Sequence, residues 1–169
     1  MIAIAGTEEG TYPDTIIEVD EYVPIKFRSY RGTLGVKYVR LGNFEDSLME
    51  FLLDPASFAI RGFTLTSFNS VHRPRGLKEL VTAVGLPMLA IDKSNFQGPI
   101  DAQRIDIHED FSVGFGEQLL EIDFGSIAKA EKIVKSDPIE FYISKEALAG
   151  LRVMNLSAKQ IAILQRQPE

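Results

Sequence analysis

The chain has 169 residues, a length typical of one domain, and its 45% apolar and 25% charged residues are the balance of an ordinary soluble globular protein. Its 18 basic and 24 acidic side chains leave a formal net charge of −6, the opposite sign to that of most proteins that bind nucleic acid through bulk attraction. Because cysteine is absent, disulfide scaffolds, zinc ribbons, iron–sulfur sites and thiol nucleophiles are excluded.

We expect no targeting signal at the amino terminus of this sequence. Residues 1–10 are apolar and then acidic, without the basic start and the long apolar stretch of a signal peptide. No segment approaches the roughly 20 apolar residues that a membrane-spanning helix requires. We therefore expect a cytoplasmic protein that does not contact a membrane.

Alternating apolar and polar residues predict strands in the first half of the chain. The strand at residues 23–28 includes Pro24, which cannot donate a backbone hydrogen bond, so this strand begins there or lies at a sheet edge. Three further strands are predicted at residues 34–41, 48–53 and 58–68. The last of these changes phase at Arg61-Gly62, which indicates a β-bulge.

In the second half, three alternating runs lie within residues 104–124, joined by the short polar connections Glu109-Asp110 and Glu117-Gln118. This pattern is typical of an antiparallel meander with one solvated face. Gly114 and Gly116 leave one face of a strand bare, so that another backbone or a partner can approach it closely.

Helices are few. An apolar stripe over residues 77–84, closed by Gly85, predicts one helix. Ser157 with Gln160 has the outline of a capping box and predicts a helix at the carboxyl end, while residues 144–150 predict a single turn. The expected fold is of the α+β class and β-dominated, with antiparallel meanders and two or three short helices.

An internal similarity occurs at an offset of 90 residues, between Met49-Glu50-Phe51-Leu52-Leu53 and Ile139-Glu140-Phe141-Tyr142-Ile143. A polar turn and a second apolar run follow each stretch. Chance similarity of strand patterns is one explanation, and a duplicated strand–turn–strand unit is the other. We expect residues 1–169 to form a single domain, which under the second explanation consists of two related halves joined near residues 92–104.

Charge is sorted along the chain in blocks. Residues 1–23 contain six acids and no base, residues 24–44 contain five bases and no acid, and residues 101–123 contain seven acids and one base. In one interpretation the blocks compensate one another across neighbouring strands. In the other, one acidic block remains uncovered and steers a cationic partner toward the protein.

The outer face of the predicted meander is the candidate partner-binding surface. Alternation places four of its residues on one face, and the turns add three more acids. The predicted partner-binding residues are Asp106, His108, Glu109, Asp110, Glu117, Glu121 and Asp123. The alternative is a solvated face without a partner.

Motifs of catalysis and metal binding are absent. The two histidines, His72 and His108, have no metal-binding spacing, and the chain has neither a phosphate-binding loop nor a nucleophile elbow. We therefore predict no catalytic residue, no metal ligand and no cofactor. Nucleic-acid binding by the basic stretch 24–44 is not predicted, because Phe27 shares the apolar face of its strand. The basic loop 70–76 is expected to be solvated, with pairing to an acidic group as the alternative.

One stretch resembles a known group of proteins. It comprises Ser47-Leu48-Met49-Glu50-Phe51-Leu52-Leu53-Asp54-Pro55 and Phe58-Ala59-Ile60-Arg61-Gly62-Phe63-Thr64-Leu65, in a small, acidic, cysteine-free and strand-rich chain. It resembles the immunity proteins encoded beside bacterial contact-dependent or polymorphic toxins. This resemblance implies a cytosolic, non-enzymatic inhibitor that binds a cognate toxin domain, often a nuclease, and blocks its active site.

We therefore predict a non-enzymatic protein-binding inhibitor that neutralises a cognate basic toxin domain through an acidic surface. The alternative is a small hydrolase or ligand-binding module with carboxylates in a cleft between the two halves, where two facing acids would include one with a raised pKa. A third hypothesis is a structural or oligomeric protein whose sheet edges pair. The sequence leaves the oligomeric state open.

Overall fold

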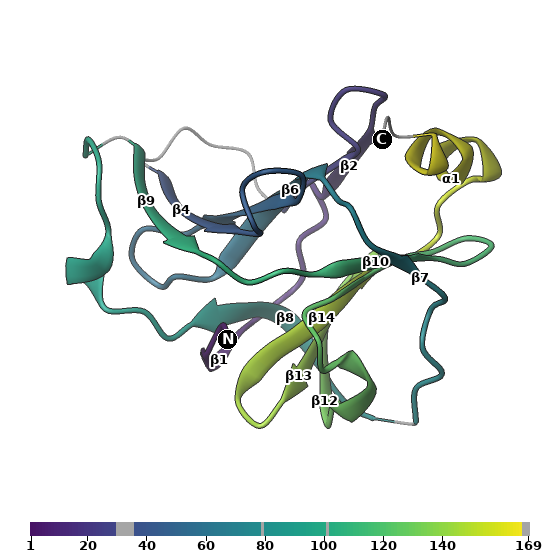
Figure 1. Cartoon of the computed structure of the whole chain (residues 1–169). Helices are drawn as coiled ribbons and strands as arrows, with labels where there is room; N and C mark the ends of the chain where they lie inside the picture. The colour runs from purple at the N-terminus through teal and green to yellow at the C-terminus, as the bar shows by residue number, and fades with distance from the viewer. Residues whose placement is uncertain (30–35, 79, 101, 167–169) are drawn as a thin grey trace.

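The computed structural model describes residues 1–29, 36–78, 80–100 and 102–166, which form two β-sheets and one α-helix around a shared hydrophobic core (Figure 1). The eight-stranded sheet contains, in spatial order, β1 (Ile4–Glu9), β8 (Val81–Leu89), β12 (Lys132–Ser136), β13 (Ile139–Ser144), β14 (Ala147–Val153), β11 (Leu120–Asp123), β10 (Ser112–Phe115) and β7 (Val71–His72). The six-stranded sheet contains β2 (Ile16–Val19), β3 (Ile25–Arg28), β6 (Ile60–Ser67), β5 (Leu48–Leu53), β4 (Val36–Leu41) and β9 (Ala102–Ile107). The predicted β-dominated fold is confirmed.

Both sheets are mixed rather than antiparallel throughout. The hairpins are antiparallel, but β4 runs parallel to β9, β8 to β12, and β7 to β10. A parallel pair needs a long connection between its strands, so it joins segments far apart in the sequence and leaves no local signature. The predicted antiparallel meanders are present as β4-β5-β6 and β12-β13-β14, whereas the parallel pairs were not predicted.

The strand orders of the two sheets correspond. The series β2-β3-β6-β5-β4-β9 and β10-β11-β14-β13-β12-β8 each contain four antiparallel pairs followed by one parallel pair. The register shifts between Leu52 and Leu53 in β5 and between Tyr142 and Ile143 in β13, positions 90 residues apart. The two similar stretches of sequence therefore occupy corresponding places in the two sheets.

The core lies between the two sheets. Phe27 in β3 packs against Phe63 in the same sheet, and against Phe141 in β13 of the other sheet at a ring-centroid distance of 6.4 Å. Phe51 in β5 contacts Phe124, which follows β11. The side chains of Phe27, Phe51 and Phe141 are fully buried, and each such burial contributes about 1.5–3 kcal/mol. The alternating aromatic residues thus hold the sheets together.

The predicted strands of the first half are confirmed, apart from residues 34 and 35, which lie outside the described residues. The predicted bulge is also confirmed, because Leu52 pairs with Gly62 and Leu53 with Ile60, which leaves Arg61 as the extra residue. Glycine is required beside it, since a Cβ at Gly62 would lie 2.4 Å from the carbonyl oxygen of Phe27.

The helix predicted over residues 77–84 is wrong, since residues 81–89 form β8, between β1 and β12; residue 79 lies outside the described residues. Val81 and Val84 are exposed, so their spacing did not mark a buried helix face. Backbone hydrogen bonds to the strands on both sides decide the conformation here. The single turn predicted at residues 144–150 is also wrong, because Lys145 and Glu146, with φ of 48° and 61°, form the tight turn of the β13–β14 hairpin.

The carboxyl-terminal helix is confirmed as α1 (Ala158–Gln165), and both hydrogen bonds of the Ser157–Gln160 capping box are present. Two 3₁₀ turns, η1 (Lys93–Asn95) and η2 (Ile127–Lys129), were not predicted. No helix in the described part of the chain is long and apolar enough to cross a membrane.

The predicted meander of residues 104–124 is divided between the two sheets. β9 pairs with β4 in the six-stranded sheet, whereas β10 and β11 form an antiparallel hairpin in the eight-stranded sheet. Conversely β1 and β8, from the first half of the chain, belong to the eight-stranded sheet. Strands of both halves are thus exchanged between the sheets, since β8 belongs to the eight-stranded sheet and β9, the next strand of the chain, to the six-stranded sheet.

Candidate functional site

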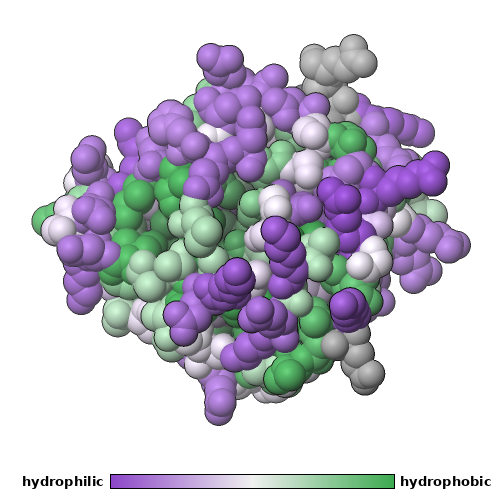
Figure 2. Space-filling model, turned by 60° about the horizontal axis from the view of Figure 1, so that its bottom comes forward, coloured by the Kyte–Doolittle hydropathy of each residue, from purple (hydrophilic) through white to green (hydrophobic). Residues whose placement is uncertain are grey.

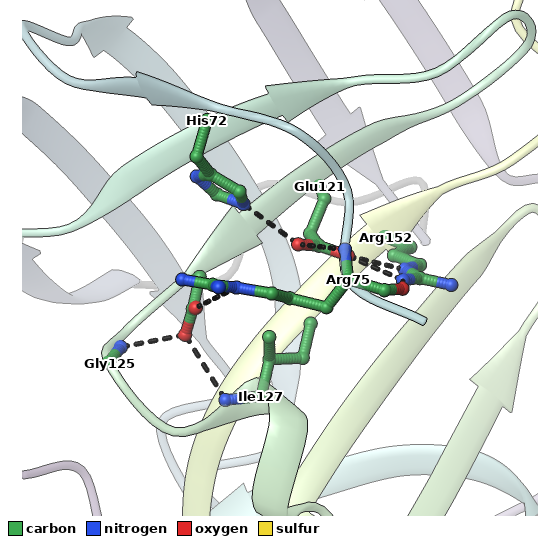
Figure 3. Close-up of polar contacts among 7 residues, drawn as sticks. His72, Arg75, Glu121, Gly125, Ile127 and Arg152 are labelled. Atoms are coloured by element: carbon green, nitrogen blue, oxygen red, sulfur yellow. Dashed lines mark hydrogen bonds and ion pairs between the residues drawn. The ribbon is translucent and has the colours of Figure 1, made fainter. Parts of the chain in front are cut away.

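A charged side chain is fully buried in the eight-stranded sheet. Glu121 in β11 has no solvent exposure, and three residues surround its carboxylate (Figure 3). Arg152 donates from Nε and Nη2 to Oε2, at 2.8 and 2.5 Å, and the backbone N–H of Arg75 lies 3.1 and 3.2 Å from the two oxygens. The Nε2 of His72 lies 2.8 Å from Oε1. Because a carboxylate only accepts hydrogen bonds, this ring nitrogen must carry the proton.

Strand register and a glycine bring these groups together. Glu121 lies directly opposite Arg152 on β14 and opposite Gly114 on β10. β7 pairs with the outer side of β10, and a Cβ at Gly114 would lie 3.0 Å from His72 Nε2 and 3.2 Å from the backbone nitrogen of Pro74. Gly114 thus leaves room for the chain's own segment 72–75. The predicted close approach of a backbone is confirmed, and an internal segment provides it.

Asp123 extends the same cluster. Its Oδ1 accepts hydrogen bonds from the backbone N–H groups of Gly125 and Ile127, at 2.7 and 3.1 Å, and so fixes the start of η2. Its Oδ2 lies 3.8 Å from Arg75 Nε. The basic loop 70–76 therefore pairs with acidic groups, which was the alternative to a solvated loop. We call His72, Arg75, Glu121, Asp123 and Arg152 the Glu121 cluster.

Polar contacts continue from this cluster along the sheet. The guanidinium of Arg152 lies 5.4 Å from the ring centroid of Tyr142, whose hydroxyl donates to Glu140. Lys135 pairs with Glu140 at 3.1 Å. Burial and the hydrogen bond to Glu140 raise the pKa of Tyr142. Charges of opposite sign thus follow one another from β11 to β12.

These contacts point to a structural role for the Glu121 cluster. Nδ1 of His72 is buried and has no hydrogen-bond partner in the described structure, so neither ring nitrogen is available as a base for a substrate. Across the described ranges, no group of three or more His, Cys, Asp or Glu side chains could hold a metal ion. The cluster attaches segment 72–75 to the sheet.

The predicted partner-binding residues do not share one face. Asp106 belongs to the other sheet, where Arg40 holds it through two hydrogen bonds of 2.7 and 2.6 Å and thereby lowers the pKa of its carboxyl. His108, just beyond β9, is exposed, and its ring contacts that of Phe44 in a tilted arrangement at a centroid distance of 4.6 Å. Glu121 and Asp123 are buried. The predicted face is wrong, because its premise was one continuous meander.

The remaining three predicted residues are exposed. Glu109 forms an ion pair with the amino group of Met1, and Asp110 accepts a hydrogen bond of 2.7 Å from the Ser47 hydroxyl. Glu117 lies in the turn between β10 and β11. A partner-binding role for these three acids stays a prediction.

Solvent-exposed acids instead gather at the end of β2. Glu18, Asp20 and Glu21 are exposed, and Tyr22 is 88% exposed. Asp20 accepts a hydrogen bond of 2.7 Å from the backbone N–H of Tyr22, which shapes the turn into β3. We call β2 with Glu18, Asp20 and Glu21 the acidic edge. Its sequence signal was the first acidic block, residues 1–23, whereas the alternation within residues 104–124 predicted the acidic surface there.

Hollows on the surface are small and open. One of about 380 Å³ lies between residues 10–15 and the β12–β13 turn, near Val84. Another of about 390 Å³ is lined by Glu109 and Asp110, which are already paired with Met1 and Ser47. Figure 2 shows apolar and hydrophilic side chains interspersed on one face of the molecule. Neither of these two hollows presents two facing acids without partners, the arrangement that the hydrolase hypothesis requires, whereas a third hollow, of about 280 Å³, is lined by Glu131 and Glu146 together with Lys132 and Lys145.

Comparison with known proteins adds no relationship: no protein-family model matches the chain, and no curated protein matches it.

Proposed function

We propose that the chain is a non-enzymatic protein-binding inhibitor that neutralises a basic protein, a toxin domain, through the acidic edge. One observation supports this surface above the others. Glu18, Asp20 and Glu21 are exposed, whereas Glu121 and Asp123 of the second acidic block are buried beside arginines. An exposed group of like charges attracts a partner of opposite charge and raises its association rate.

The resemblance to immunity proteins supplies the class of partner. In this proposal the protein acts in the cytoplasm, where it covers the basic cleft of the toxin domain and excludes the substrate. The exposed aromatic ring of Tyr22, next to Glu21, suits such an interface, because tyrosine is frequent among residues that dominate binding energy.

Toxins of this kind are encoded beside their inhibitors, so the test uses the polypeptide encoded by the neighbouring reading frame. We expect this polypeptide to arrest growth when produced alone, and co-production of the chain to restore growth through a complex that dissociates faster at high salt. Absence of a complex between the purified proteins would overturn the proposal.

A charge-reversal pair identifies the surface. Glu18→Lys/Asp20→Lys should weaken the complex about tenfold or more. The matched control Glu45→Lys/Glu131→Lys makes the same change of charge at exposed acids elsewhere and should preserve it. Equal affinities of the two variants would remove the acidic edge from the proposal.

We also propose that the two sheets arose from a duplicated unit. The corresponding strand orders and the two register shifts 90 residues apart support it. Homologous sequences test it: profiles of residues 41–68 and 124–156 should align with one another better than either aligns with the remaining strands.

A further inference from the structure

The outer side of β10 already holds an added strand. β7, a strand of only two residues, pairs parallel with β10 through Val71 opposite Val113 and His72 opposite Gly114 (Figure 1). In the correspondence of the two sheets, β2 takes the place of β10. β2 is the terminal strand of its sheet, with no described strand on its outer side. Among the described residues, a strand thus fills this position in one sheet and none fills it in the other.

The outer side of β2 has backbone groups suited to pairing. The backbone N–H of Asp20 donates to the carbonyl oxygen of Pro24. Glu18, two residues before Asp20, lies opposite Lys26 in β3. The backbone N–H and C=O groups of Asp20 and Glu18 therefore point toward β3. Because an antiparallel ladder alternates, the N–H and C=O groups of Ile17 and Val19 point away from β3. The helix α1 contacts β2, but a helix satisfies its own backbone groups and cannot pair with a strand.

Charge indicates which kind of strand fits. In the eight-stranded sheet, His72, Gly114 and Glu121 lie side by side across the neighbouring strands β7, β10 and β11. There β7 brings a basic side chain, His72, to the buried acid Glu121. In the six-stranded sheet, Glu18 on β2 and Lys26 on β3 occupy the places of Gly114 and Glu121, and Glu18 is exposed at the edge of the sheet. An added strand would therefore place its side chains beside Glu18 and Asp20, and basic side chains fit there.

We propose that an extended basic segment of the partner protein binds to β2 as a further strand of the six-stranded sheet. Backbone hydrogen bonds to Ile17 and Val19 hold the segment, and its lysine or arginine side chains pair with Glu18 and Asp20. This inference rests on the proposed function, since it specifies how the acidic edge recognises the toxin.

The first test needs no natural partner. The full chain, labelled with ¹⁵N, is titrated with an eight-residue peptide of alternating lysine and valine, and with a matched peptide of alternating glutamate and valine. The basic peptide should shift the amide signals of β2 and slow hydrogen exchange at Ile17 and Val19, and the acidic peptide should do neither. Equal responses to both peptides, or shifts confined to other strands, would overturn the inference.

The second test separates edge pairing from charge. Val19→Pro removes an outward-facing N–H without breaking the ladder to β3, so it should weaken peptide binding about tenfold or more while thermal unfolding stays cooperative. If unfolding shows that this variant misfolds, Glu18→Lys/Asp20→Lys must still abolish binding of the basic peptide. Retained binding in that double variant contradicts the inference.

The same variants separate this inference from the proposed function. A complex with the product of the neighbouring reading frame that Val19→Pro leaves unchanged would overturn pairing at β2 and preserve the inhibitor. Binding of the basic peptide at β2 without any complex with that product would preserve pairing at β2 and overturn the inhibitor function. Sedimentation of the chain alone tests whether a second copy of the chain pairs with β2. A dimer that is lost in Val19→Pro would show that a second copy binds at this edge and would overturn the inference.

Discussion

Glu121 and Arg152 face each other across β11 and β14, and two nitrogens of the arginine donate to the same carboxylate oxygen inside the protein. Glu121 is fully buried, and Arg152 retains 12% side-chain exposure. Removing two charges from water is costly, and only the dense set of donors around Glu121 offsets that cost. The pair therefore tolerates the loss of neither partner.

Loss of one partner should be severe. Arg152→Ala leaves Glu121 buried without its main counter-charge, so we expect the free energy of unfolding to fall by about 3–5 kcal/mol in urea denaturation. Glu117→Gln, at an exposed acid in the adjoining turn, is the control and should stay within about 0.5 kcal/mol. A loss below about 1 kcal/mol in Arg152→Ala would show that the pair contributes little.

Gly114 and Gly76 form a matched pair of glycines. A Cβ at Gly114 would press on His72 and Pro74, whereas a Cβ at Gly76 would meet nothing within 4 Å. Gly114→Ala should therefore destabilise the protein by about 1–3 kcal/mol and speed hydrogen exchange at Arg75, whose N–H binds Glu121. Gly76→Ala should be neutral or stabilising by up to about 1 kcal/mol. Equal effects of both changes would contradict the close approach of segment 72–75.

Asp106 should make stability depend on acid pH. The hydrogen bonds from Arg40 lower the pKa of this carboxyl in the folded state. Its contribution is therefore present above the unfolded pKa and is lost as the pH falls through the folded pKa. Asp106→Asn should cost about 0.2–1 kcal/mol at pH 7, and the difference from the wild type should vanish near pH 2. A difference that stays constant from pH 7 to pH 2 would exclude the ion pair as its cause.

Glu50 should show the opposite dependence. Burial raises the pKa of this carboxyl, although Arg40 partly offsets the effect. The folded state therefore favours the protonated form, and stability is lost as the pH rises through the folded pKa. Glu50→Gln should stabilise the protein by about 0.5 kcal/mol at pH 7, with the gain shrinking below pH 4. Thermal unfolding from pH 3 to pH 8 measures it, and a gain that grows toward low pH would refute the explanation.

Local patterns predicted the elements whose conformation depends on their own side chains. Alternation located β5 at residues 48–53, and it indicated the bulge at Arg61 because an extra residue changes the phase of the apolar face. The capping box located the start of α1, since both of its hydrogen bonds lie within four residues. The error over residues 77–84 arose because Val81 and Val84 are exposed in β8, so their helical spacing did not reflect burial.

The candidate site depended on information that no single segment contains. Asp106 and Glu121 have similar positions in similar alternating runs, yet one pairs with Arg40 on β4 and the other with Arg152 on β14. The partner of each acid is fixed by strand order. Asp106 meets Arg40, 66 positions away, across the parallel pair of β4 and β9, and Glu121 meets Arg152, 31 positions away, across the antiparallel pair of β11 and β14. A block of acidic residues in the sequence therefore does not show whether its side chains are exposed to solvent or buried beside an arginine.

The sequence by itself determined that this protein is strand-rich, cysteine-free and acidic, and that Phe27 faces its core, because the alternation within one strand is a local property. Only the tertiary structure decided which acids of each block are exposed. Pairing across the sheets buries Glu121 and Asp123 and leaves Glu18, Asp20 and Glu21 at an open edge. The physical reason is that burial of a charge requires a counter-charge, and that counter-charge comes from a distant part of the chain.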